Sequence, residues 1–146
     1  MPLTFDLPLE QLHTYQGSTP KPTDFDAFWD QGLIEMQALD SQIELIPADF
    51  SSAIADCYHL YFNGVGGARV HARLLLPKKP IATHGPAVLM FHGYYGQSDD
   101  WSIKLPYVSE GFVVAALDCR GQAGLSEDLG GVAGYTLRGH IVRGLD

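Results

Sequence analysis

The sequence predicts an α/β fold in which antiparallel strands lead into a parallel sheet. Residues 56–77 hold two β-rich runs around an Asn-Gly turn, which is typical of a hairpin. Residues 87–91 and 112–117 are unbroken apolar runs with a helix-length segment between them. Such runs are typical of strands covered on both faces, and the order strand, helix, strand favours a parallel pair with a right-handed crossover.

The first 40 residues predict an irregular arm followed by a helix. Thr23 and Asp24 are candidate caps, and apolar residues recur at helical spacing through residues 24–39. We therefore expect an amphipathic helix whose aromatic residues pack against the protein and form no cofactor site. The arm prolines are Pro2, Pro8, Pro20 and Pro22, and the apolar helix positions are Phe25, Phe28, Trp29, Leu33 and Met36.

The hairpin follows a short strand candidate at residues 42–47. In its second half Val70, Ala72 and Leu74 alternate with Arg69, His71 and Arg73, which predicts one apolar face and one face in solvent. His59 and His71 lie on the two strands. A metal pair is conceivable, but ordinary strand-face histidines are the favoured interpretation.

Composition and charge narrow the class of protein. A chain of 146 residues favours one domain, here divided into an arm and helix (1–40) and a partial sheet core (41–146). The formal net charge of -8 disfavours a nucleic-acid surface. Two cysteines make no disulfide framework. We see no signal peptide and no membrane span, so we expect a cytoplasmic protein. We also expect neither a metal nor a cofactor.

Two polar, glycine-bearing loops follow the two apolar strands. They are residues 92–96 (HGYYG) and residues 118–124 (DCRGQAG). Ligands of open parallel sheets bind beyond the carboxyl ends of the strands, so these loops predict a site on one rim of the sheet.

The first loop has the composition of an oxyanion loop. Gly93 after His92 would let the chain bend and approach a substrate, and the N–H of Tyr94 would then point at a developing negative charge. The Tyr94 side chain would wall the acyl pocket. The alternative is an ordinary strand exit that uses glycine for the turn.

The second loop offers charges and an amide. Asp118 and Arg120 form a charged pair at the end of a buried strand, and the planar guanidinium suits a loop-bracing role better than a catalytic one. The side chain of Gln122 has donors and an acceptor that can fix a neighbouring loop.

Five stretches carry a resemblance to a known family. These stretches are DFDAFWD (24–30), GGARVHARLLLPK (66–78), FHGYYGQSDDW (91–101), DCRGQAGLSED (118–128) and GYTLRGHIVRGLD (134–146). On them, the chain is similar to the N-terminal part of the acetyl xylan esterase / cephalosporin C deacetylase family (carbohydrate esterase family 7).

The resemblance implies the N-terminal portion of an α/β-hydrolase and a serine esterase. Such enzymes remove acetyl groups from xylo-oligosaccharides, small sugar esters and cephalosporin C, without a cofactor and as hexamers. Tyr94 matches the oxyanion and substrate-contacting tyrosine, with His92 and Gly93 as motif support. Arg120, Gly121 and Gln122 match the signature loop that supports the site.

The chain departs from the family at the nucleophile. The family has Gly-x-Ser-Gln-Gly, whereas no Gly-x-Ser-x-Gly occurs in this chain, and neither Ser98 nor Ser126 stands in such an elbow. The triad order Ser, Asp, His places all three after this sequence, so His92 and His140 (in a predicted helix) do not replace them. We expect a chain truncated before the nucleophile elbow, inactive alone and prone to aggregate through its exposed sheet edge.

A second interpretation keeps the same rim loops without catalysis. The chain would then be a non-catalytic binding or assembly module, an alternative that the missing elbow favours. A nucleotide-binding domain is disfavoured, since no G-x-G-x-x-G or phosphate loop follows either apolar strand.

Overall fold

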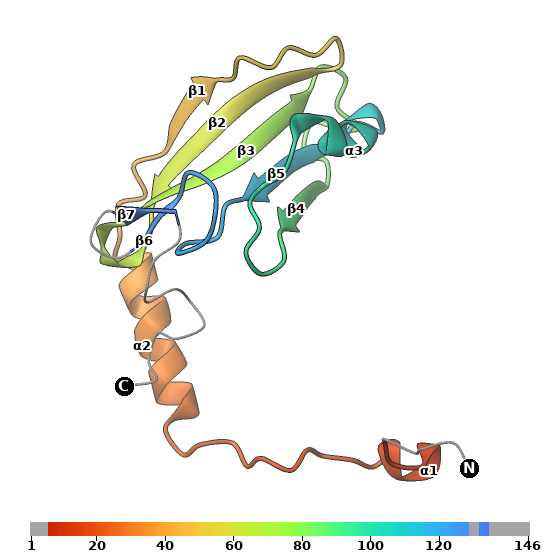
Figure 1. Ribbon diagram of the computed structural model, residues 1–146, viewed down its shortest axis with the longest axis vertical. Coiled ribbons are helices and arrows are strands. Elements are labelled where there is room, and N and C mark those ends of the chain that lie inside the picture. Colours follow the sequence, from red (N-terminus) through yellow and green to blue (C-terminus); the bar gives the residue numbers. More distant parts are fainter. Residues whose placement is uncertain (1–5, 129–131, 135–146) are drawn as a thin grey trace. The chain divides into compact units, whose positions relative to one another are not determined.

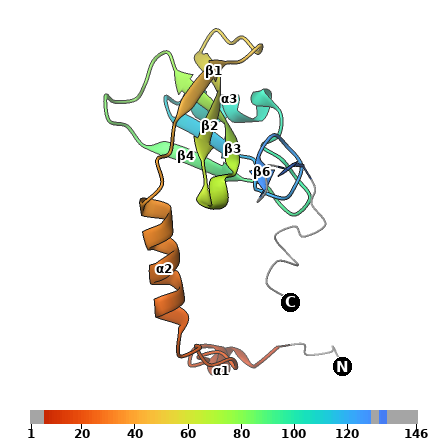
Figure 2. The same ribbon diagram turned by 90° about the vertical axis from the view of Figure 1, so that its left-hand side faces the viewer.

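The computed structural model describes residues 6–128 and 132–134 (Figures 1 and 2). It divides into two compact units, which we call the N-terminal unit (Met1–Ile34) and the sheet unit (Glu35–Asp146). His140 and the helix predicted around it lie outside the described residues.

The N-terminal unit contains helix α1 (Leu9–Leu12) and most of helix α2 (Phe25–Gln37), which confirms the helix predicted at 24–39. Lys21 stands beside the start of α2, with its Nζ 2.6 Å from Asp26 Oδ1 and 5.0 Å from the centre of the Phe25 ring. The Phe25 and Phe28 rings both contact Trp29. The packing of these aromatic residues against other parts of the protein stays a prediction.

The sheet unit is built on one mixed sheet of five strands in the order β1-β2-β3-β5-β4 (Figure 1). Neighbours are antiparallel except for the parallel pair β4 and β5. The predicted hairpin and the predicted parallel pair therefore join in a single sheet, because β3 pairs with β5. The strands are β1 (Glu44–Pro47), β2 (Ala55–Asn63), β3 (Arg69–Pro77), β4 (Ala87–Phe91) and β5 (Val113–Leu117).

Short helical turns lie in two of the connections between these strands. The turn η1 (Val65–Gly67) closes the hairpin. The crossover from β4 to β5 contains η2 (Trp101–Lys104) and α3 (Leu105–Ser109), with a proline in the first turn of α3, where the missing N–H has no helical partner to lose. A small second sheet pairs β6 (Glu127–Asp128) with β7 (Val132–Ala133).

The core lies on the face of the sheet that α3 covers. Its buried residues are Ala55, Cys57, Leu75, Val108 and Val114, with Phe50, Val88, Met90, Trp101 and Leu105 packed around them. On the opposite face Leu89 and Phe91 of the edge strand β4 are 64% and 66% exposed. The prediction that β4 is covered on both faces is therefore wrong for the described residues, because an apolar run shows only that a strand can be buried.

The prediction that the polar row of β3 faces solvent is wrong, because none of its three side chains is fully exposed. Arg69, His71 and Arg73 share the side of β3 that carries the core residue Leu75, and His71 is fully buried. Hydrogen-bond partners near the end of β5 compensate for the burial of His71. None of the helices among the described residues combines the length and the apolar character that crossing a bilayer requires.

Candidate functional site

Two loops meet at the carboxyl ends of β4 and β5. We call residues 92–100 the first rim loop and residues 118–126 the second rim loop. Because β4 and β5 are parallel neighbours, their ends lie at the same edge of the sheet. The two loops hydrogen bond to each other, for example from the Tyr95 N–H to Gln122 Oε1 at 2.6 Å.

The first rim loop bends at Tyr95 and not at Gly93. Tyr95 has φ 66°, a left-handed conformation that non-glycine residues rarely adopt. Gly93 has no positive φ, and a Cβ added there would meet nothing within 4 Å. Gly96 is the glycine that the bend requires, since an added Cβ would lie 3.0 Å from Gly93 O and from His92 Nδ1.

Tyr94 stands at the exposed tip of this bend. Its side chain is 65% exposed and contacts the Tyr95 ring edge-on, with the ring centres 4.9 Å apart. The tyrosine is therefore accessible to a ligand at the rim, as a substrate-contacting role requires. The role of its backbone N–H stays a prediction.

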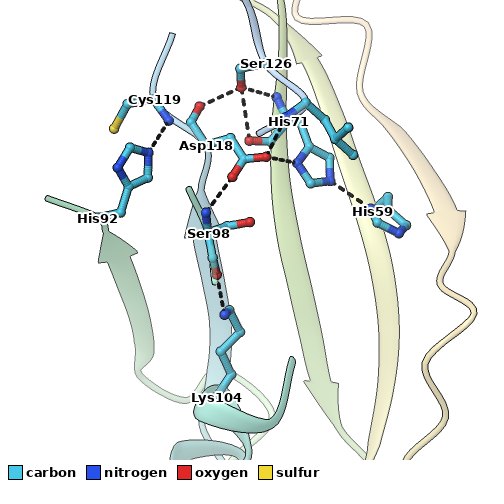
Figure 3. Close-up of polar contacts among 9 residues, drawn as sticks. His59, His71, His92, Ser98, Lys104, Asp118, Cys119 and Ser126 are labelled. Carbon is cyan, nitrogen blue, oxygen red and sulfur yellow. Dashed lines mark hydrogen bonds and ion pairs between the residues drawn. The ribbon is translucent and has the colours of Figure 1, made fainter. Parts of the chain in front are cut away.

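His92 joins the two rim loops through one ring nitrogen and contacts its own loop through the other. Nε2 accepts the Cys119 N–H at 2.9 Å, as Figure 3 shows, and Nδ1 lies 2.8 Å from Gly93 O. A ring that accepts at Nε2 and faces a carbonyl with Nδ1 is the neutral Nδ1–H tautomer. With both nitrogens engaged, His92 holds the backbone at Cys119 and at Gly93.

Asp118 pairs with His71, so the predicted pairing of Asp118 with Arg120 is wrong. The carboxylate Oδ2 lies 2.6 Å from His71 Nδ1 and accepts the Leu125 N–H, and Oδ1 accepts the Ser98 N–H at 2.6 Å (Figure 3). Burial alone would raise the pKa of Asp118. The hydrogen bonds from His71, Leu125 and Ser98 outweigh burial and hold this pKa well below its ordinary value.

Arg120 braces the second rim loop against the hairpin turn. Its Nη1 donates to Val65 O at 2.8 Å, and its Nη2 lies 3.7 Å from Asp128 Oδ1. The next residue, Gly121, has φ 74°, which glycine adopts without strain. These contacts agree with a bracing arginine.

The sequence did not point to a chain of contacts that starts at Asp118. His71 Nε2 lies 2.8 Å from His59 Nδ1, and the half-buried His59 ring meets Trp101 edge-on at 5.4 Å. Burial lowers the pKa of His59, and the charges of His71 and Arg73 lower it further. The one sequence feature that could have indicated this contact is that His59 and His71 lie on the two strands of the predicted hairpin.

We expect Trp101 fluorescence to report protonation of His59. In a Trp29→Phe background, quenching by the imidazolium should appear with a midpoint below pH 6.5, because the folded protein binds this proton more weakly than a free histidine does. A fluorescence titration from pH 8 to pH 4 measures the midpoint, and His59→Gln should remove the transition. A midpoint at or above 6.5 would contradict the assignment.

Neither serine near Asp118 is arranged as a nucleophile. Ser126 is buried, and its Oγ accepts the backbone N–H of His71 at 2.8 Å and donates to Asp118 O at 2.6 Å. Ser98 is buried beside the Asp118 carboxylate. In a serine–histidine pair the serine hydroxyl hydrogen bonds to an imidazole nitrogen, whereas the hydroxyl of Ser126 bonds to backbone atoms. In residues 6–128 and 132–134 no three His, Cys, Asp or Glu side chains gather as a metal site.

Comparisons with known proteins agree on one family. The model of the family described as Acetyl xylan esterase (AXE1) matches residues 1–146. The chain is similar to acetyl xylan esterase 1 from Thermoanaerobacterium sp. JW/SL YS485, with 51% identity, a TM-score of 0.85 and coverage of 97% of this chain and 44% of that one. It is also similar to the acetyl xylan esterase from Paenibacillus sp. R4, with 26% identity, a TM-score of 0.74 and coverage of 91% and 43%. The chain thus spans less than half the length of each of these relatives.

Proposed function

The chain belongs to the acetyl xylan esterase family, and from this premise we propose that it supplies the oxyanion side of a serine esterase. A carboxylic ester hydrolase is what the family implies. The substrates we propose are acetylated xylo-oligosaccharides and small acetyl esters such as cephalosporin C. The observation that carries the proposal is the pair of rim loops, tied to each other and presenting Tyr94 at their exposed tip.

The chemistry assigns a limited part to these residues. Deacetylation needs a serine that attacks the acetyl carbonyl, a histidine that takes the serine proton, and N–H donors for the oxyanion. Tyr94 offers a backbone N–H for the last of these tasks. We propose that serine, histidine and their orienting acid come from residues other than these 146, so that this chain alone does not hydrolyse esters.

The first experiment compares the isolated chain with a chimera. The chimera joins residues 1–146 to the remainder of the Thermoanaerobacterium esterase, in place of the part of that enzyme that the chain matches. Both are assayed with p-nitrophenyl acetate and a serine-reactive fluorophosphonate probe. We expect neither turnover nor labelling for the isolated chain, and both for the chimera.

The two possible surprises have different meanings. Labelling of the isolated chain would contradict our account, because Ser98 or another serine would then be the nucleophile. A folded chimera without turnover would refute the esterase role of these loops and favour the non-catalytic binding or assembly module.

Within the chimera, Tyr94→Pro should lower kcat by about 10²–10³, because proline removes the backbone N–H and one lost oxyanion donor costs this much. Tyr94→Phe keeps the N–H and is the matched control, with kcat expected within a fewfold of the parent. Equal kcat values for the two variants would show that the N–H of Tyr94 takes no part in the reaction.

The family resemblance also leads us to propose a homo-hexamer in the cytoplasm. Sedimentation velocity of the chimera and of the isolated chain tests the assembly. A chimera that sediments as a monomer would contradict the hexamer without affecting the esterase proposal.

A further inference from the structure

The first rim loop is strained and needs support. Tyr95 and Asp99 have φ of 66° and 55°, a region in which the backbone of a non-glycine residue is strained. Such a conformation persists only where neighbouring contacts determine it. The Gln122 side chain holds the loop at the Tyr95 N–H, and a second support acts at Ser98.

Two buried side chains of opposite charge hold the backbone of Ser98. Asp118 Oδ1 accepts the Ser98 N–H at 2.6 Å, and Lys104 Nζ donates to the Ser98 carbonyl by a short hydrogen bond (Figure 3). Lys104 also donates to Asp100 O at 2.9 Å. Lys104 and Asp118 are 1% and 2% exposed, so neither is a surface charge that happens to touch the loop.

The lysine is costly at this position. Burial lowers the pKa of Lys104 and the nearby Arg73 lowers it further, and the carboxylates of Asp99, Asp100 and Asp118 offset only part of this. A methionine has a similar length and would fill the space without the desolvation of an ammonium group. What methionine cannot do is donate to the carbonyls of Ser98 and Asp100. We therefore attribute the charge of Lys104 to its hydrogen bonds with the loop backbone and not to the packing of the core.

We propose that Lys104 and Asp118 are positioning residues that clamp the Ser98 backbone and thereby hold the first rim loop so that the direction of the Tyr94 N–H is fixed. The purpose of this clamp rests on the proposed function. A backbone N–H that stabilises an oxyanion must be held to within about 0.5 Å of its productive position. Lys104 and Asp118 touch the loop and not a substrate, and act through the backbone between them.

The test on the 146-residue chain is amide hydrogen exchange followed by NMR. Lys104→Met should accelerate exchange at Ser98 and Tyr95 by about 10-fold or more, as expected for losing a hydrogen bond to a charged group. Exchange at Leu75 and Val114 in the sheet core should stay within about twofold of the parent. Lys104→Arg, which can still donate, should restore part of the protection. Asp118→Asn should also accelerate exchange at Ser98.

Lys78→Met is the matched control. Lys78 Nζ also donates to a backbone carbonyl, that of Ser52 at 3.0 Å. Its side chain is exposed, and Lys78 lies far from both rim loops in the sequence. It should leave exchange at Ser98 and Tyr95 unchanged. The clamp is overturned if Lys104→Met behaves like Lys78→Met, or if it accelerates the sheet core and the loop by the same factor.

A kinetic measurement separates positioning from structural support. In the chimera, Lys104→Met should lower kcat by about 10-fold with KM within about twofold, because misplaced oxyanion donors weaken the transition state more than the ground state. Unchanged kcat in a folded variant would overturn the positioning role. A parent chimera without turnover would refute the proposed function, while hydrogen exchange would still decide whether the clamp exists.

Discussion

Replacing Asp118 by alanine should lower the free energy of unfolding of the sheet unit by about 3–5 kcal/mol, because several buried groups lose a charged hydrogen-bond acceptor at once. The carboxylate is 2% exposed and has three partners, the His71 ring and the N–H groups of Ser98 and Leu125. Alanine leaves all three without their acceptor. Urea unfolding followed by circular dichroism measures the change.

Asp56→Ala is the control for this prediction. Asp56 is exposed and its Oδ1 lies 3.9 Å from Lys78 Nζ, so its loss should change stability by no more than about 0.5 kcal/mol. Similar losses for the two variants would contradict the central place of Asp118. If Asp118→Ala does not fold, Asp118→Asn, which retains one acceptor oxygen, should fold with a smaller loss.

The stability that Asp118 contributes should depend on pH in one direction. Its folded pKa lies below the unfolded value of about 3.9, so the folded state binds this proton more weakly. The contribution is fully present well above pH 4 and is lost as the pH falls through the lower folded pKa. The gap in unfolding free energy between the parent and Asp118→Ala should therefore narrow on acidification below pH 4. A gap that stays constant from pH 7 to pH 3 would show that the ionised carboxylate is not what stabilises the fold.

Gly124→Ala should destabilise the sheet unit by about 2–5 kcal/mol, the sum of a backbone cost and an overpacking cost. Gly124 has φ 104°, and an added Cβ would lie 2.5 and 2.7 Å from the two carboxylate oxygens of Asp118. The methyl group would therefore push the carboxylate away from His71. Urea unfolding again gives the magnitude.

Gly67→Ala separates the two costs. Gly67 has φ 75°, and an added Cβ there would meet nothing within 4 Å, so only the backbone cost of about 1–2 kcal/mol should appear. A loss at Gly124 no larger than at Gly67 would mean that the space beside Asp118 is not needed.

The local patterns predicted the elements well, because each depends on neighbours in sequence. Helical spacing of aromatic residues gave α2, the Asn-Gly turn gave the β2–β3 hairpin, and the apolar runs gave the parallel pair β4 and β5. The rim of the sheet followed from the same runs, since parallel strands end on one side.

The face of a strand was harder to predict than the strand itself. His71 alternates with apolar residues as a solvent-facing residue would, and yet it is fully buried. Its partner Asp118 is 47 residues away and is reached because β3 lies beside β5 in the sheet. No local pattern encodes that neighbour, so the pairing of Asp118 with the nearby Arg120 was the natural error.

The sequence by itself determined which segments form strands and helices, which loops meet at the rim, and which family the chain resembles. Only the tertiary structure decided that Tyr95 takes the bend, that His71 pairs with Asp118, and that Lys104 reaches the Ser98 carbonyl. The physical reason is burial. A buried charge must find its partner among whatever residues the fold brings near, and the order of the sheet, not the order of the chain, sets those neighbours.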